Sequence, residues 1–165
     1  MITKEECFKK LREIIDVTIS TVDTNGNPQS RIIDIMHNNS DTIYFLTARG
    51  KNFYKELENN PHISILGLKD NKTIRIETKA KKLADQKKWI DLMFEKNPIM
   101  NNVYPDKSRY ILEPFCITSG KIEYFDLTQH PIYRKTILLN NTDPIVKTGY
   151  EINNKCTIIY RFYQY

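Results

Sequence analysis

Three short β-prone segments joined by polar turns constrain the fold of this chain most strongly. The segments cover residues 17–21, 29–37 (QSRIIDIMH) and 42–47 (TIYFLT). The links between them, DTNGNP (23–28) and HNNSD (37–41), are rich in residues that tolerate positive φ, and the first ends in a proline that interrupts strand pairing. Connections this short require antiparallel neighbours. The sequence therefore predicts an antiparallel meander over residues 17–47.

Helical periodicity places three helices around this meander. Thr3 and Glu6 have capping-box spacing before a helix over 4–15, a short helix over 51–59 ends ahead of Pro61, and Asp85 caps a helix over 86–96. The third helix is expected to bury Trp89, Leu92, Met93 and Ile90. Further strands are expected at 62–68, 73–83 and 114–126, with a loop at 97–108. Six mostly antiparallel strands with flanking helices predict a mainly β fold, a small closed or partly closed barrel.

Composition narrows the class of protein. The 165 residues suit one domain, and no apolar run reaches the roughly 18 residues of a spanning helix, so no membrane association is expected. The net charge of +5 is spread along the chain among 20 acidic residues, which favours an anionic small ligand over nucleic acid. Cys7, Cys116 and Cys156 are far apart, and the N-terminus lacks a secretory layout, which indicates a reducing cytoplasm. The cysteines and histidines show no metal-ligand spacing, so no metal is expected.

The run Thr47 to Lys51 (TARGK) lies where a predicted strand stops and a helix starts. A hydroxyl, a guanidinium, an ammonium and a helix N-terminus together suit a phosphate group. Arg31 lies one strand earlier and reaches the same place if the two strands are neighbours. The same residues also suit a solvated basic loop, and the spacing alone leaves both alternatives open.

Taken in order, these features resemble a known family. An N-terminal helix, a DxxGxP turn (23–28), Arg31, the Thr47-x-x-x-Lys51 strand end and Asn60-Pro61 before an apolar strand are similar to the FMN-binding split-barrel family related to pyridoxamine 5'-phosphate oxidase. The similarity extends to about residue 127. IRIETKAKKLAD (74–85) resembles the family's next strand, with Thr78 where a glycine is usual.

The resemblance implies a homodimer of six-stranded antiparallel Greek-key split β-barrels with FMN at the subunit interface. Residues 1–127 are then the FMN-binding domain, and 128–165 an extension packed on the barrel or the partner subunit. Carried over to this chain, the site consists of side chains for the phosphate and ribityl chain (Arg31, Thr47, Arg49, Lys51), backbone for the isoalloxazine edge (Ile32, Ile33, Asp34) and, as a weaker assignment, Thr73.

The C-terminal part departs from the family. The Arg- and Trp-rich segment of true pyridoxamine-phosphate oxidases is missing from 128–165, so vitamin B6 oxidation is not expected, and the chain looks more like the general-stress and nitroimidazole-resistance relatives. GYEINNKC (149–156) resembles the lead-in to a ferredoxin-type cluster, but Ile159 and Phe162 occupy the next two ligand places. One thiolate cannot hold a cluster. The tail is therefore either a degenerate remnant or a structural strand.

The leading hypothesis is an FMN-dependent oxidoreductase in which flavin N5 transfers a hydride or electrons to an unidentified small molecule. No side chain is expected to act as catalytic acid or base. NADH, NADPH or a separate redox protein is expected to reduce the flavin. Two alternatives stay open: a flavin- or haem-binding protein without turnover, and a cofactor-free interaction protein.

Overall fold

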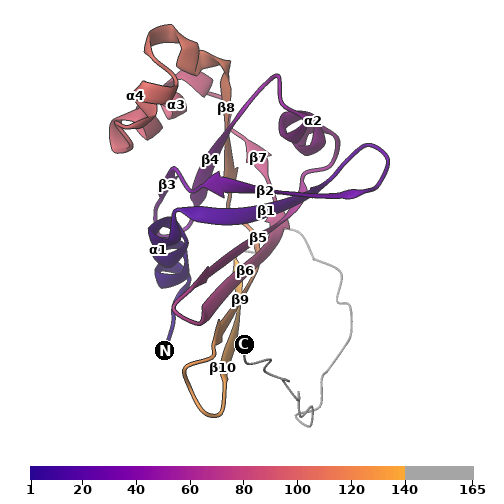
Figure 1. The fold of residues 1–165 in the computed structure, drawn as a ribbon, viewed down its shortest axis with the longest axis vertical. Coiled ribbons are helices and arrows are strands. Elements are labelled where there is room, and N and C mark those ends of the chain that lie inside the picture. Colours follow the sequence, from indigo (N-terminus) through magenta and orange to yellow (C-terminus); the bar gives the residue numbers. More distant parts are fainter. Residues whose placement is uncertain (140–165) are drawn as a thin grey trace, which may run out of the picture.

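The computed structural model describes residues 1–139 (Figure 1). Its helices and strands follow in this order: α1 (Lys4–Ile14), β1 (Asp16–Val22), β2 (Pro28–Asp34), β3 (His37–Asn38), β4 (Ile43–Ala48), α2 (Asn52–Asn59), β5 (His62–Lys69), β6 (Lys72–Lys79), β7 (Lys81–Lys82), α3 (Gln86–Lys96), α4 (Met100–Val103), the 3₁₀ helix η1 (Asp106–Ile111), β8 (Leu112–Ile117), β9 (Gly120–Asp126) and β10 (Tyr133–Leu139).

The strands form two antiparallel sheets. The larger has the order β10-β9-β6-β5-β1-β2, and the smaller has the order β3-β4-β8-β7. The predicted meander is split between them, because β1 and β2 pair in the large sheet whereas β3 and β4 pair in the small one. The mainly β class, the antiparallel pairing and the flanking helices are confirmed.

One apolar core fills the space between the two sheets. Residues from α1 (Phe8, Leu11), the large sheet (Ile19, Ile65) and the small sheet (Phe45) are all fully buried in it. The other face of the small sheet is covered by α3, so that all six residues of β8 are buried. In Figure 1, α3 and α4 lie at the upper left and α2 at the upper right, at the same end of the molecule.

The described chain has ten strands rather than the six expected, because three predicted segments divide between the sheets and β10 was not predicted. The first division, between β2 and β3, falls inside the segment predicted at 29–37. The segment predicted at 73–83 leaves β6 at Ala80, whose N–H donates to the Pro61 carbonyl at 2.8 Å, and continues as β7. The segment predicted at 114–126 breaks between Ile117 and Gly120 into β8 and β9. The prediction of three continuous strands was wrong, because apolar alternation does not report which sheet a residue joins.

Gly120 makes the division between β8 and β9 possible. Its φ of +129° is unfavourable for a residue with a side chain, and a Cβ there would lie 2.3 Å from the Glu77 carbonyl oxygen. Thr78, at the place where the family usually has glycine, is buried nearby and donates its hydroxyl to the Ser119 carbonyl at 2.5 Å. The close approach of β9 to β6 thus depends on Gly120.

The predicted helix starts are confirmed. Thr3 and Glu6 form the reciprocal capping box of α1, and Asp85 accepts from the Lys88 backbone N–H at 3.3 Å. The buried face of α3 differs from the prediction. Ile90, Met93 and Phe94 are buried, whereas Trp89 and Leu92 are only half-buried. The segment predicted as a loop at 97–108 contains α4 and the beginning of η1.

Beyond residue 127, β10 pairs along its whole length with β9 and extends the large sheet. The division into domains at 127 stays a prediction. The tail proposed as a cluster remnant, with Cys156, Ile159 and Phe162, lies outside the described residues. Within residues 1–139, every helix is too short or too polar to cross a bilayer.

Candidate functional site

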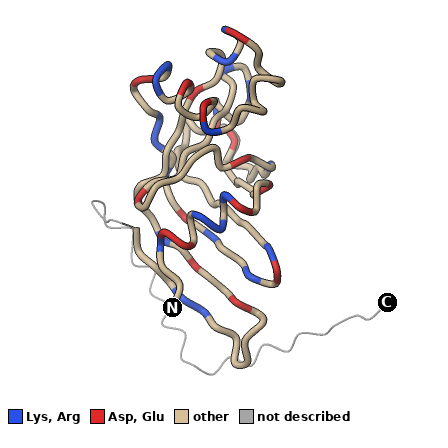
Figure 2. Tube along the Cα trace, turned by 90° about the vertical axis from the view of Figure 1, so that its left-hand side faces the viewer, with Lys and Arg blue, Asp and Glu red and all other residues tan. Residues whose placement is uncertain are grey.

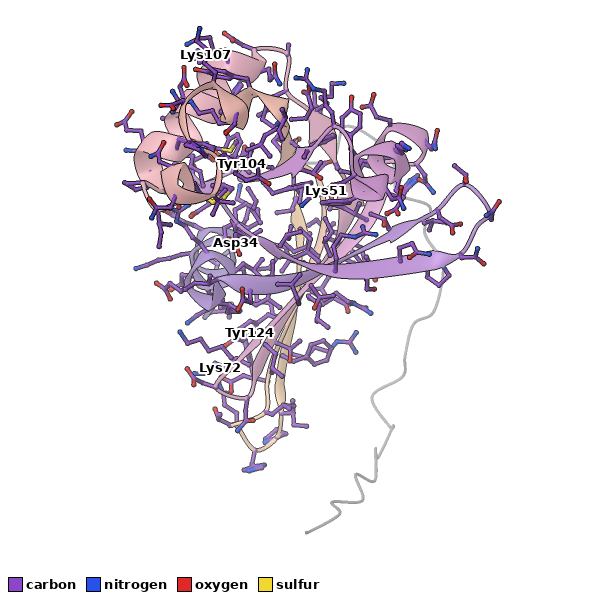
Figure 3. All side chains as sticks on the ribbon, turned by 45° about the horizontal axis from the view of Figure 1, so that its top comes forward. Asp34, Lys51, Lys72, Tyr104, Lys107 and Tyr124 are labelled. Carbon is purple, nitrogen blue, oxygen red and sulfur yellow. The ribbon has the colours of Figure 1, made fainter. Side chains whose placement is uncertain are left out.

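A cleft of about 570 Å³ lies between β2, the end of β4, the start of α2 and the α4 region. It brings together six of the eight residues that the sequence nominates: Arg31, Ile32, Ile33, Asp34, Thr47 and Lys51. Figure 3 shows Asp34, Lys51 and Tyr104 around this region, whereas Lys72 and Tyr124 lie toward the opposite end of the molecule. The nominated residues thus converge although they come from three separate elements.

The edge strand β2 forms one side of the cleft. Within the described chain it pairs only with β1, and its residues 29–34 line the cleft without interruption. In an antiparallel pair, alternate residues direct their N–H and C=O groups away from the partner strand. Part of the β2 backbone is therefore available to hydrogen-bond a ligand, and the role of the Ile32 to Asp34 backbone stays a prediction.

Thr47, the next-to-last residue of β4, supplies a polar atom that lacks a partner. The residue is 4% exposed, and its Oγ1 makes no hydrogen bond within residues 1–139. A buried hydroxyl without a partner is uncommon because it gives up its hydrogen bonds to water. Since Thr47 lines the cleft, a bound acceptor is the simplest way to satisfy it.

The N-terminus of α2 lies in the cleft wall together with Thr47. Lys51 is its N-cap residue and makes no side-chain cap, and Asn52 and Phe53 follow it along the cleft wall. The first N–H groups of a helix have no intrahelical acceptor and attract anions. Together with the exposed Lys51 ammonium and the Thr47 hydroxyl, they form a donor set suited to a phosphate.

Arg31 faces the barrel interior and is already engaged. Its guanidinium contacts the Glu56 carboxylate at 2.7 Å, donates to the Thr21 hydroxyl at 2.7 Å and lies 4.5 Å from the centre of the Phe53 ring. Glu56, which lines the cleft, was missed by the sequence reasoning. The available signal was its position between Phe53 and Leu57, since residues at this spacing share the buried face of the helix.

Two nominated residues lie outside the cleft lining. Arg49 contacts Glu113 at 3.3 Å and donates to the Tyr110 carbonyl at 2.6 Å, which fixes the β4–α2 connection to the start of β8. Thr73 lies on β6, separated from β2 by β5 and β1. Within one chain, neither Arg49 nor Thr73 lies with the other nominated residues in the cleft lining. Their roles in cofactor binding stay predictions.

The remaining wall is apolar and was not anticipated. Met100 and Tyr104, at the start of α4 and just past its end, line the cleft with Leu46, Met36 and Leu112.

Asp34 lies at the C-terminal end of β2. The pKa of its carboxyl group is raised from its ordinary value by burial and by the negative charge of Asp16, its partner across the β1–β2 ladder. The cleft therefore has a cationic end, an apolar wall and a backbone edge.

Comparison with known proteins agrees with this architecture. The family model described as pyridoxamine 5'-phosphate oxidase matches residues 3–127. The pyridoxine/pyridoxamine 5'-phosphate oxidase of Yersinia pestis bv. Antiqua (strain Angola) is 36% identical over 63 residues, which are 38% of this chain. The matched segment spans 29% of the length of that curated relative.

Three solved structures share the fold. A NimC/NimA family protein from Clostridium acetobutylicum superposes with a TM-score of 0.69 at 20% identity, covering 82% of this chain and 93% of its own. General stress protein 26 from Bacillus anthracis str. Sterne gives 0.59 at 20% identity over 80% and 98%. A pyridoxamine 5'-phosphate oxidase-related, FMN-binding protein from Nostoc punctiforme PCC 73102 gives 0.54 at 11% identity over 81% and 91%. With the family match over residues 3–127 and this shared architecture, the chain belongs to the pyridoxamine 5'-phosphate oxidase family.

Proposed function

We propose that this protein binds FMN in the cleft and acts as an FMN-dependent oxidoreductase. The observation that carries the proposal is the buried, unpartnered hydroxyl of Thr47 beside Lys51 and the N-terminus of α2. A flavin phosphate carries roughly 1.5 to 2 negative charges and accepts hydrogen bonds at three oxygens, so it suits this donor set. The FMN-binding neighbour from Nostoc punctiforme supports the same choice of flavin.

The cleft offers a separate surface to each part of the cofactor. Thr47, Lys51 and the α2 N-terminus would hold the phosphate, and the free edge of β2 at Ile32, Ile33 and Asp34 would hydrogen-bond the polar edge of the ring. When bound, the isoalloxazine supplies the hydride or electron transfer. The chain binds and orients it, while Met100 and Tyr104 limit which small molecules approach from the apolar wall.

A homodimer is part of the proposal. Ile32 on β2 and Leu66 on β5 are both aligned with Thr18 of β1, so they share one row on the outer face of the large sheet. They are 59% and 43% exposed, which is unusual for two large apolar side chains in one row. Because Ile32 also lines the cleft, a second copy on this face would bring its own residues to the cofactor.

We further propose that NADH, NADPH or a separate redox protein reduces the flavin, and that the protein acts in the cytoplasm. Within residues 1–139, Cys7 and Cys116 are buried and form no disulfide, which agrees with a reducing compartment. Vitamin B6 is not the proposed substrate. Basic and acidic residues are interspersed along the described chain (Figure 2), which agrees with a small-molecule partner rather than nucleic acid.

The absorption spectrum of the protein purified from cells tests cofactor binding. Flavin bands near roughly 370 and 450 nm, with FMN released on denaturation, are expected. A Soret band would instead identify a haem protein, and a colourless protein that FMN cannot reconstitute would refute flavin binding. Anaerobic mixing with NADH or NADPH then tests turnover, since a flavin that no donor reduces belongs to a binding protein.

Lys51→Gln tests where the phosphate lies. Removing the cation of the cleft end is expected to weaken FMN binding at least tenfold, about 1.4 kcal/mol. Lys55→Gln is the matched control, because Lys55 is exposed on the same helix but outside the cleft lining. Equal affinities for both variants would move the phosphate away from the α2 N-terminus.

A further inference from the structure

Glu56 places a buried negative charge in the wall of the cleft. It is 6% exposed, on the inward face of α2. Its carboxylate accepts from the Thr21 hydroxyl at 2.5 Å and from the Arg31 guanidinium at 2.7 Å. The Arg31 guanidinium and the Thr21 hydroxyl replace part of the hydration that the carboxylate loses on burial.

The ion pair between Arg31 and Glu56 reduces the net positive charge at the end of the cleft proposed to hold the phosphate. Arg31 and Lys51 are the two cationic side chains of the cleft lining, but Glu56 compensates the charge of Arg31. Lys51 makes no ion pair within residues 1–139. The uncompensated positive charge of the cleft wall is thus that of Lys51, assisted by the α2 N-terminus.

We infer that Glu56 is a specificity-determining residue, which sets how strongly the cleft distinguishes a phosphorylated flavin from an unphosphorylated one. The inference rests on the proposed flavin site. Glu56 repels a phosphate dianion, and the repulsion is weakly screened because the carboxylate is shielded from water. The same carboxylate exerts no net repulsion on the uncharged ribityl chain and ring. Glu56 therefore lowers the affinity for FMN selectively and leaves that for riboflavin nearly unchanged.

Glu56→Gln removes the charge and keeps the shape, and its amide oxygen can still accept from Thr21 and Arg31. Dissociation constants for FMN and riboflavin are measured by flavin fluorescence for the wild type and this variant. FMN is expected to bind at least about fivefold more tightly to the variant, with riboflavin within about twofold of the wild type. The matched control is Glu58→Gln, since Glu58 is exposed on the same helix and pairs with Lys82 at 3.4 Å, and it should change neither constant.

A double variant, Arg31→Met with Glu56→Met, keeps the inference testable if Glu56→Gln fails to fold, because a buried ion pair is tolerated better when removed as a unit. The net charge of the cleft is unchanged, so the ratio of FMN to riboflavin affinity should stay within about twofold of the wild type. Should Arg31 itself bind the phosphate, the double variant would lose FMN affinity selectively, and the inference would be overturned.

The outcomes separate the two proposals. An unchanged or weakened FMN affinity in Glu56→Gln, in a wild type that binds flavin, overturns the role of Glu56 and leaves the flavin site intact. A wild type that binds neither FMN nor riboflavin overturns both.

Discussion

Replacing Thr47 with valine should change stability and cofactor affinity in opposite directions. Valine keeps nearly the same volume but removes the buried Oγ1, which has no hydrogen-bond partner within the described chain. Burial of an unpaired hydroxyl costs about 1–3 kcal/mol, so the apoprotein should gain roughly 1 kcal/mol in free energy of unfolding. A hydrogen bond to a charged phosphate contributes about 1.5–3 kcal/mol, so FMN affinity should fall at least tenfold.

Urea unfolding of the apoprotein and titration with FMN measure the two effects. Thr21→Val is the matched contrast, because Thr21 is equally buried on a strand but its hydroxyl is paired with Glu56 and Arg31. That variant should lower the unfolding free energy by about 1–3 kcal/mol. The reasoning is refuted if Thr47→Val destabilises the apoprotein by a similar amount while FMN affinity is unchanged, because the hydroxyl would then have a structural partner.

Two further predictions concern stability. Gly120→Ala should lower the unfolding free energy by at least about 2 kcal/mol, because the added Cβ would lie 2.3 Å from the Glu77 carbonyl oxygen and the φ of Gly120 is +129°. The control is Gly50→Ala, since a Cβ on Gly50 meets open space. Equal melting temperatures for the two variants would contradict the steric argument. Burial, assisted by Glu6, raises the pKa of Cys7 to about 11. The unfolded thiol ionises first, so the stability that Cys7 contributes is complete below about pH 9 and is lost as pH rises toward 11, by about 2 kcal/mol. Urea unfolding of the wild type and Cys7→Ala at several pH values should show this loss in the wild type alone, and parallel curves would contradict it.

The sequence predicted local structure well where one residue type has one physical role. The Thr3–Glu6 capping box, the Asp85 cap and the turn before Pro28 depend on contacts within a few residues, and the structure has them. The strands that divide at Ala80 and before Gly120 were not predictable in this way. Alternation reports burial, but the sheet that buries a residue is decided by contacts far along the chain.

The candidate site shows the same limit. The order of the motifs and the family resemblance nominated Arg31, Thr47 and Lys51, and all three line one cleft although β2 and β4 belong to different sheets. The motifs were not enough to find Glu56, which turns Arg31 into half of an ion pair, or to place Arg49 against Glu113. Charge partners across elements depend on packing, and a basic residue in a sequence does not reveal whether its charge is already compensated.

The free edge of β2 also matters for the quality of the folded protein in the cell. Within residues 1–139, β2 pairs on one side only, with β1. An unpaired strand edge is a template for pairing with another chain, and the exposed side chain of Ile32 adds to that hazard. A ligand seated along the edge, or a second subunit over it, would act as a cover. With the proposed flavin as that cover, its supply during synthesis would affect solubility, and the yield of soluble protein should follow the flavin content of the expressing cell.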